Sequence, residues 1–361
     1  MGAAIAWQAS VRGLSVAAFD AHEPPHTLGS THGHSRIIRE AYFEHPQYVP
    51  LVQRAFALWA ELESTTATRL FQACGGLMIG RPGGVLVDGT LRAATEHRLA
   101  VQTWAADGVR ERVPALAPDP DMVGVFEPRA GVLAPERAVG AMLDVARQAG
   151  ARLFMSEPVR SWTSESGHVE VRSANRHVRA RRLVLAAGPW LASMLGKLIL
   201  PLTVERVVQY WYPTSGDQRF APSSFPIFLL EAPDGRMLYG LPDQGRGLKL
   251  AEHHGGTTTT GDGVRRDVHP VEREAFDAFA RRWLRELPAG PSDASVCLYT
   301  NTPDSDFLLD WHPAAPDVFI CSACSGHGFK FAPAIGEAVA SLVATGTSPH
   351  DLGPFRLARL T

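Results

Sequence analysis

The sequence predicts an α/β fold built from two interleaved domains, and three patterns support this prediction. A helical stretch over 3–11 ends at a glycine and is followed by an apolar, β-branched strand over 14–19. Apolar residues recur at helical spacing over 135–148, and this helix leads into a strand over 151–154. The unbroken apolar run 183–187 is typical of a buried parallel strand. Helices and strands therefore alternate along the chain.

Other segments add elements to this outline. Helical spacing over 48–62 and 276–287 predicts two amphipathic helices that pack on the core. The segments 169–172 and 177–180 alternate like the two strands of a hairpin, and 334–343 reads as another apolar helix. No repeat or Pro/Gly-rich linker separates the domains, so we expect them to interleave.

Composition excludes several classes of protein. The chain has 361 residues, of which 45% are hydrophobic and 20% charged, as in large globular proteins. The 35 Lys and Arg balance the 37 Asp and Glu to a net charge of −2, so no nucleic-acid partner is expected. No apolar run reaches the ~18 residues of a membrane span, and no signal peptide is expected. With only four cysteines, the sequence predicts a cytoplasmic protein without a membrane partner.

Asp20 ends the predicted second strand and follows Gly2 at roughly the 20-residue spacing of a dinucleotide-binding unit. In such a unit an acidic residue at this place accepts hydrogen bonds from the adenosine ribose. The alternative is an ordinary surface aspartate at a strand end. Of the glycine-rich turn that should precede it, only Met1 and Gly2 are present.

The segment 29–39 concentrates His32, His34, Arg36 and Arg39 in a glycine-containing loop. Two guanidinium groups three residues apart can converge on one carboxylate if the backbone turns helically there. The alternative is a solvated basic loop.

Cys321 and Cys324 have the spacing of a redox or zinc motif, but no second cysteine pair accompanies them, so no metal site is expected. The glycine-rich segment 325–331 follows and leads into the predicted helix at 334. Such an arrangement suits an anion at a helix N-terminus, and a plain loop-to-helix junction is the alternative.

Several segments together resemble the monomeric sarcosine oxidase and N-methyltryptophan oxidase family, flavoproteins of the D-amino-acid oxidase superfamily. The most specific are PPHTLGSTHGHSRIIREAY (24–42), YGLPDQGRGLKLAEHHGG (239–256), CLYTNTPDSDFLLD (297–310) and SGHGFKFAPAIGE (325–337). The likeness covers essentially the whole chain. The ending PFRLARL and the AEHHGG stretch are nearer to the N-methyltryptophan branch.

The resemblance implies a Rossmann-like FAD-binding domain, here lacking its first strand, interleaved with an antiparallel-sheet substrate domain. The FAD-binding domain is expected over 1–72, 134–200 and 304–361, and the substrate domain over 73–133 and 201–303. Aligned with the family, Met1 and Gly2 fall on the last two positions of its Gly-x-Gly-x-x-Gly turn. We therefore expect Met1 to be an internal methionine of a longer reading frame, and the alternative is a truncated, inactive flavoprotein remnant.

The resemblance also implies roles for individual side chains. Cys297 matches the cysteine that links FAD covalently, and Lys249 matches the lysine at the oxygen-activation site, where a fixed ammonium stabilises developing charge. Arg39 and Lys330 match the pair that binds the substrate carboxylate, and Tyr299 is expected beside the substrate. Further catalytic-site residues are expected at His32, Arg36, Tyr239 and His253. Further FAD contacts are expected at Gly2, Asp20, Ser30, Arg36, Val159, Gly326, Gly328, Phe329 and Lys330.

The reaction implied is the FAD-dependent oxidation of an N-methyl amino acid, either sarcosine or N-methyl-L-tryptophan. Oxygen is reduced to hydrogen peroxide, and the imine formed is hydrolysed to the amino acid and formaldehyde. Alternatives are the inactive remnant and an oxidase or dehydrogenase of another secondary amino acid. A monomer is expected, with the small substrate and oxygen as its only partners.

Overall fold

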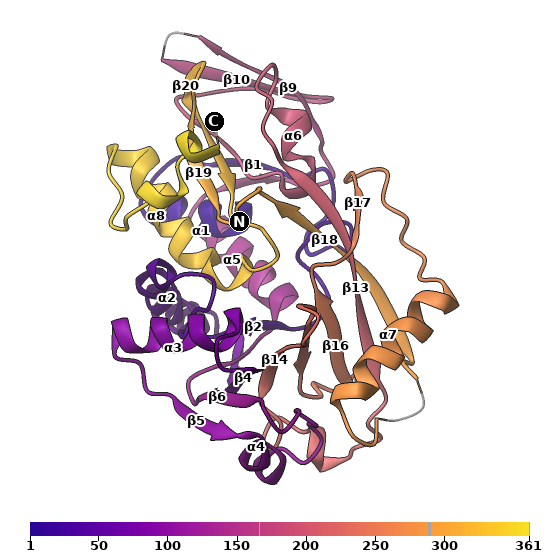
Figure 1. Cartoon of the computed structure of the whole chain (residues 1–361). Helices are drawn as coiled ribbons and strands as arrows, with labels where there is room; N and C mark the ends of the chain where they lie inside the picture. The colour runs from indigo at the N-terminus through magenta and orange to yellow at the C-terminus, as the bar shows by residue number, and fades with distance from the viewer. Residues whose placement is uncertain (166, 288–289, 361) are drawn as a thin grey trace.

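A computed structural model describes residues 1–165, 167–287 and 290–360 and has a mixed α/β architecture (Figure 1). Its helices are α1 (Gly2–Val11), α2 (Val49–Thr66), α3 (Val85–His97), α4 (Ala106–Arg112), α5 (Pro135–Gln148), α6 (Leu191–Met194), α7 (Pro270–Trp283) and α8 (Ala332–Thr345). None of the helices in the described residues is both long and apolar enough to cross a bilayer.

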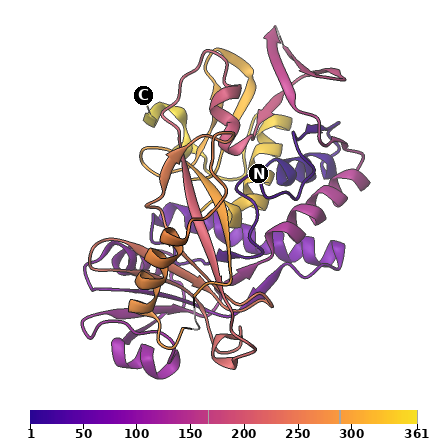
Figure 2. The same cartoon turned by 90° about the vertical axis from the view of Figure 1, so that its right-hand side faces the viewer.

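One large, mostly antiparallel sheet forms the lower half of the molecule in Figure 1. Its order is β17 (Thr257–Thr259), β13 (Thr203–Tyr212), β16 (Leu248–His253), β15 (Met237–Leu241), β14 (Ile227–Glu231), β4 (Gly76–Gly80), β6 (Val123–Glu127) and β5 (Gln102–Ala105), and β18 (Asp293–Asn301) also pairs with β13. Helix α7 (orange) covers the side of this sheet that lies away from α1 (indigo), as the two views show (Figure 2).

The four smaller sheets of the described residues are built from strands of the first, middle and last parts of the chain. Two are parallel or mixed: β1 (Ala17–Phe19) with β8 (Arg152–Phe154), and β12 (Leu183–Leu185) with β20 (Ala315–Ser322) and β19 (Leu308–His312). Two are antiparallel: β2 (Arg36–Ile38), β7 (Gly131–Leu133) and β3 (Phe71–Ala73), and the meander β9 (Val159–Glu165), β10 (His168–Ser173) and β11 (His177–Ala180).

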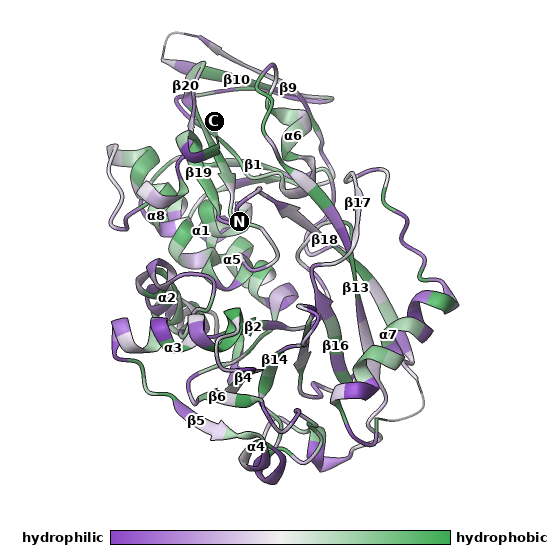
Figure 3. Cartoon of the chain, viewed as in Figure 1, coloured by the Kyte–Doolittle hydropathy of each residue, from purple (hydrophilic) through white to green (hydrophobic). Residues whose placement is uncertain are grey.

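Helix α1 is the centre of the largest hydrophobic core. It packs against α5 and α8, and residues 4–10 are all buried. An amphipathic helix would expose one side, but α1 and α8 are apolar along most of their length (Figure 3). Gly336 of α8 lets the two helices approach, because a Cβ there would lie 2.6 Å from the carbonyl oxygen of Ala4.

The predicted helices over 3–11 and 135–148 are confirmed as α1 and α5, and the hairpin is confirmed as β10 and β11. The run 183–187 is confirmed as the parallel strand β12, although it is shorter than predicted. The strand over 14–19 is limited to β1. The helical turn that would let Arg36 and Arg39 converge is not formed, because Arg36–Ile38 is the strand β2, which pairs with β7. The domain boundaries stay a prediction.

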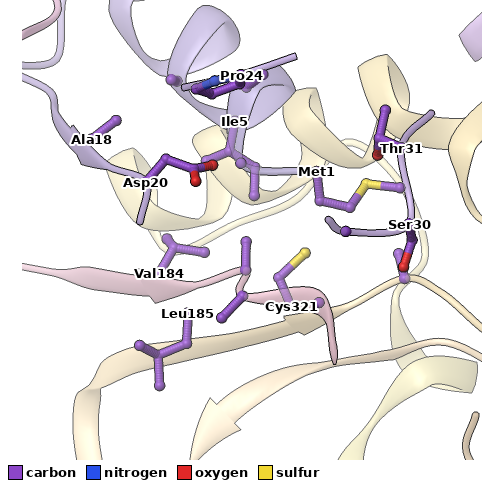
Figure 4. A pocket seen from close by; sticks show the side chains of 18 of the residues that line it. Met1, Ile5, Ala18, Asp20, Pro24, Ser30, Thr31, Val184, Leu185 and Cys321 are labelled. Carbon is purple, nitrogen blue, oxygen red and sulfur yellow. The ribbon is translucent and has the colours of Figure 1, made fainter. Parts of the chain in front are cut away.

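Strands β1 and β12 each leave one edge unpaired in the described residues, since β1 pairs with β8 alone and β12 with β20 alone. Both edges border the same cavity. Figure 4 shows Ala18 and Asp20 on one side of this space, Val184 and Leu185 on the other, and Ile5 of α1 between them. The parallel strands of the predicted nucleotide-binding domain therefore form two separate sheets that face each other across the cavity.

Candidate active site

A cavity of about 960 Å³ extends from the facing edges of β1 and β12 to the large sheet. It brings together almost all of the site residues predicted from the sequence, although they come from segments far apart along the chain. Its lining includes Gly2, Asp20, Ser30, Arg36, Arg39, Val159, Tyr239, Lys249, His253, Tyr299, Gly326, Gly328, Phe329 and Lys330. The other two predicted site residues, His32 and Cys297, are buried behind this wall.

Lys249 projects from β16 and is almost completely buried, with 2% of its surface exposed. Its Nζ donates to the carbonyl oxygens of Gly33 and Ser35, each at 2.9 Å. Burial and the nearby Arg36 lower the pKa of Lys249 well below its usual value, whereas Glu136 acts in the opposite direction. The amine is therefore held in one place at the cavity wall, in an environment where added negative charge would stabilise its protonated form.

Arg36 connects the loop before β2 to the thiol of Cys297 on β18. Its guanidinium donates to the carbonyl oxygens of Ser35 and Ser30, each at 2.9 Å, and its Nη2 lies 3.6 Å from the Cys297 Sγ. The Cys297 Sγ in turn lies 3.6 Å from the Ser30 carbonyl oxygen. Cys297 is 1% exposed, and its two contacts, Ser30 and Arg36, line the cavity.

Arg39 and Glu44 form a buried ion pair on the cavity wall. The Arg39 Nη2 lies 2.7 and 3.0 Å from the two carboxylate oxygens, and Nη1 donates to the Ala41 carbonyl at 2.9 Å. Although burial opposes both charges, each partner stabilises the other: Arg39 lowers the pKa of Glu44 to about 2, and Glu44 raises that of Arg39. Arg39 therefore pairs with Glu44, whereas Arg36 contacts Ser30 and Cys297.

Lys330 supplies a second buried cation beside Arg39. Its Nζ donates to the His327 carbonyl at 2.7 Å and to the Tyr42 hydroxyl at 3.3 Å, and this hydroxyl is 2.7 Å from the His327 Nδ1. Burial, followed by the charge of Arg39, lowers the pKa of Lys330 to about 7. Lys330 is therefore poised to gain a full positive charge when an anion arrives.

Neutral aromatic side chains line the cavity together with these cations. The ring of His253 lies 6.4 Å from Tyr239 and 5.8 Å from Tyr299, measured between ring centroids. Burial lowers the pKa of His253 well below its usual value and raises that of Tyr239 to about 12, so both side chains are neutral near pH 7. Gly326 adjoins this aromatic wall: it has a φ of +77°, and a Cβ would lie 2.7 Å from Tyr299.

The far end of the cavity has features suited to a nucleotide. Helix α1 begins at Gly2 in the cavity wall, and no side chain caps its N-terminus, which leaves backbone N–H groups for an anion such as a pyrophosphate. Asp20 Oδ1 accepts from the His22 N–H at 2.9 Å and lies 3.5 Å from His26 Nε2. This fixes the carboxylate at the end of β1, where a dinucleotide-binding fold places its ribose acid.

Several buried polar atoms around the cavity have no partner among the described residues, as expected if a polar ligand completes the site. They include Ser30 Oγ, His32 Nε2 and Gln209 Oε1. These orphaned atoms, the cavity volume and the uncapped helix fit FAD. Cys321 and Cys324 also line the cavity, but burial raises the pKa of both thiols. In the described part of the chain, no cluster of three or more His, Cys, Asp and Glu could hold a metal ion.

Comparison with known proteins agrees with this geometry. Residues 1–342 match the FAD dependent oxidoreductase family model (DAO). The chain is 39% identical to the monomeric sarcosine oxidase of Streptomyces avermitilis, over 100% of this chain and 95% of that protein. It is 36% identical to the N-methyl-L-tryptophan oxidase of Yersinia pestis (strain Pestoides F), over 99% of this chain and 96% of that protein.

Solved structures support the same fold. The open form of NikD, described as an unusual amino acid oxidase essential for nikkomycin biosynthesis, superposes with a TM-score of 0.85 at 21% identity, covering 98% of this chain and 94% of NikD. The L-proline dehydrogenase of P. horikoshii superposes with a TM-score of 0.84 at 18% identity, covering 98% and 93%. At these identities, the likeness establishes the fold alone.

Fold and relatives together define the class of protein, a flavin-dependent amine oxidase that uses oxygen as its electron acceptor. The chain belongs to the family of FAD-dependent oxidoreductases that contains monomeric sarcosine oxidase and N-methyl-L-tryptophan oxidase. The family and fold class predicted from the sequence are thereby confirmed.

The sequence did not reveal several residues that shape the site. Glu44, Tyr42 and His327 surround the two cations, and Glu136 holds the loop beside Lys249. Glu136 lies in the first turn of α5, where an acidic residue is ordinary, so no signal marks it. Of these residues, His327 alone lies in the glycine-rich segment 325–331 that the sequence analysis associated with anion binding.

Proposed function

We propose that this protein is an FAD-dependent oxidase of an N-methyl amino acid, with sarcosine and N-methyl-L-tryptophan as the leading substrates. The observation that carries the proposal is the pair of buried cations, Arg39 and Lys330, which line the same cavity as the neutral aromatic groups and Lys249. A carboxylate and a secondary amine on neighbouring atoms match this division of the cavity into a cationic and a neutral side.

The cationic side would bind the substrate carboxylate. Arg39 is already paired with Glu44, so the charge available to a ligand comes mainly from Lys330. A bound carboxylate would raise the pKa of Lys330 from about 7 and complete a charge-assisted hydrogen bond. Orienting the substrate in this way holds its amine end near Tyr239 and His253.

The neutral side would bind the amine. His253 is uncharged near pH 7, so its ring can accept a hydrogen bond from the amine without repelling a positive charge. When bound, FAD supplies the acceptor for a hydride equivalent from the carbon beside the amine nitrogen. The resulting substrate imine is hydrolysed by water to the amino acid and formaldehyde, and oxygen ends as hydrogen peroxide.

The chain's own residues would hold FAD along the cavity. The N-terminus of α1 at Gly2 suits the pyrophosphate, Asp20 suits the ribose, and Val159, which also lines the cavity, would contact the adenosine part. Near the ring, Ser30 and Arg36 surround the Cys297 thiol, which we propose as the covalent attachment point. Lys249 would stabilise negative charge as electrons pass to oxygen.

A second candidate is a flavoprotein remnant that does not retain FAD. It is favoured by the unpaired edges of β1 and β12, since a gap in the sheet weakens the cradle for the nucleotide.

Substrate turnover separates these candidates. Peroxide and formaldehyde are measured with sarcosine, with N-methyl-L-tryptophan, and with glycine and tryptophan as unmethylated controls. The proposal expects stoichiometric peroxide and formaldehyde from at least one N-methylated substrate. No peroxide from any N-methyl or other secondary amino acid, with FAD added, would overturn it.

A further inference from the structure

We propose that Glu136 is a positioning residue for Lys249: it holds the loop formed by residues 33–35, which in turn fixes the lysine amine at the cavity wall. This inference rests on the proposed role of Lys249 in the reaction with oxygen. Glu136 belongs to α5 and does not line the cavity, so it acts only through the loop and through its charge.

The first link joins Glu136 to the loop backbone. One carboxylate oxygen, Oε1, accepts hydrogen bonds from two successive backbone N–H groups, those of Gly33 at 2.8 Å and His34 at 3.0 Å. Burial opposes the charge of Glu136, but the backbone N–H groups of His34 and of Glu136 itself, with the nearby Arg36, lower the pKa of the carboxyl. Glu136 is therefore an anion at neutral pH, and it is the acceptor that holds this turn.

The turn needs such an acceptor because its backbone is strained. Gly33 has a φ of +100° and His34 a φ of +66°, and a non-glycine residue seldom adopts the left-handed region. Two successive N–H groups in this conformation point toward the same side, where Glu136 receives both. Without that carboxylate, the turn would lose the interaction that offsets the strain at His34.

The second link joins the loop to Lys249. The carbonyl oxygens of Gly33 and Ser35 accept from the Lys249 Nζ at 2.9 Å, so the loop bonded to Glu136 on one side holds the amine on the other. The packing is tight: a Cβ at Gly33 would lie 2.1 Å from Gln209 Oε1 and 3.3 Å from the Lys249 Nζ. A shift of the turn would move the amine with it.

The charge of Glu136 supports the same role. Lys249 lies near the cation Arg36, which opposes protonation of the lysine, whereas the negative charge of Glu136 favours it. Glu136→Ala removes both the hydrogen bonds and the charge. Glu136→Gln keeps an acceptor oxygen and removes the charge alone, so the two variants separate the two contributions.

A matched control exists on α2. The Glu63 Oε1 likewise accepts two successive backbone N–H groups, those of Leu70 and Phe71 at 2.6 and 2.8 Å, and Glu63 does not line the cavity. If any such carboxylate affected the oxygen reaction merely by stabilising the fold, Glu63→Ala would have the same effect as Glu136→Ala.

The first measurement needs no flavin. The chain has only three lysines, Lys197, Lys249 and Lys330, so acetylation of each by acetic anhydride can be followed by mass spectrometry. We expect Glu136→Ala to speed acetylation of Lys249 by roughly tenfold or more relative to Lys330, Glu136→Gln to speed it less, and Glu63→Ala to leave it unchanged. Equal Lys249 reactivity in wild type and Glu136→Ala would overturn the proposal.

The second measurement separates the two half-reactions of the FAD-loaded enzyme. We expect Glu136→Ala to slow reoxidation of the reduced flavin by oxygen roughly 10- to 100-fold, while anaerobic reduction by substrate stays within about twofold. If Glu136→Ala fails to fold, Glu136→Gln decides, with slower reoxidation and an unchanged KM for the substrate. Unchanged reoxidation, or an equal loss in both half-reactions, would contradict the proposal.

A wild type without oxidase activity would instead overturn the proposed function, and the acetylation result would still decide whether Glu136 positions Lys249.

Discussion

The Arg39 guanidinium lies 2.7 Å from a carboxylate oxygen of Glu44, and this buried pair shares the cavity wall with Lys330. Once Lys330 is protonated, two cations and one anion leave a net positive charge among these largely buried groups. A carboxylate that enters can neutralise this excess, and a neutral ligand cannot. The charge balance of these three residues therefore favours an anionic substrate.

Replacing Arg39 by alanine removes one cation and leaves Glu44 as an unpaired buried anion that repels the substrate. We expect Arg39→Ala to raise the substrate KM by roughly 10- to 100-fold, as for the loss of a charge-assisted hydrogen bond of about 1.5–3 kcal/mol. Arg206→Ala is the control, since Arg206 forms a similar buried pair with Glu272 outside the cavity. Steady-state kinetics that show an unchanged KM in Arg39→Ala would refute the role of Arg39.

Lys249→Met removes the amine while keeping a side chain of similar length. Because the Lys249 amine then no longer stabilises charge on oxygen, we expect reoxidation of the reduced flavin to slow by roughly 100-fold or more, with little change in flavin reduction by substrate. Lys197→Met, on the exposed surface, is the control. Stopped-flow measurement of both half-reactions tests this, and undiminished oxygen reactivity would exclude Lys249 from that step.

The pKa of Lys330, about 7, predicts a pH dependence of anion binding. Its protonated form attracts a carboxylate and is lost as the pH rises through 7, while His327, with a pKa of about 4, and Glu44, with a pKa of about 2, do not titrate in that range. We expect the Ki of propionate, a carboxylate without an amine, to rise by up to about tenfold per pH unit above pH 7.

The control for this titration is Lys330→Met. In that variant propionate should bind weakly, with a Ki that stays flat between pH 6 and about 9, because the titrating group is gone. A wild-type Ki that is independent of pH over this range would show that Lys330 does not contact the ligand.

Gly326→Ala tests the aromatic wall. A methyl group there would lie 2.7 Å from the Tyr299 ring and 3.0 Å from the ring of His253, and it would also strain the backbone at a φ of +77°. Gly235→Ala is the matched control, since Gly235 has a φ of +85° and open space around its Cβ position. We expect both variants to lose about 1 kcal/mol of stability from the backbone strain.

Only Gly326→Ala should also lower kcat/KM, by roughly tenfold or more, because the rings that face the substrate must move. Thermal unfolding and steady-state kinetics on the two variants separate these effects. Equal losses of activity in both would mean that the wall does not contact the substrate.

The spacing of apolar residues along the sequence was sufficient to predict helices such as α5. The 3.6-residue spacing over 135–148, with Pro135 at the first turn, predicted α5 with its observed bounds. The strand pairing of β2 was not predictable in this way, because β2 pairs with β7, some hundred residues along the chain. A helical turn, which convergence of Arg36 and Arg39 on one anion would have required, is excluded by this long-range pairing.

The family resemblance predicted which residues line the cavity, but it did not predict the hydrogen bonds and ion pairs that hold them. The bond from Glu136 to Gly33 joins residues 103 positions apart, and no spacing in the sequence indicates it. The pairing of Arg39 with Glu44 is closer in sequence, but an arginine five residues before a glutamate is common on any surface. Only the folded chain shows that Arg39 is buried and that Glu44 is partly buried beside it.

The central claim is that the chain carries FAD, attached to Cys297, in the cavity beside Lys249. It is tested most directly by the visible spectrum of the purified protein before and after acid precipitation, with Cys297→Ser beside the wild type. The account predicts flavin absorption in both proteins, a yellow pellet from the wild type, and a colourless pellet with a yellow supernatant from Cys297→Ser. A yellow supernatant from the wild type would refute the covalent link, and a colourless wild type that takes up no added FAD would contradict the claim itself.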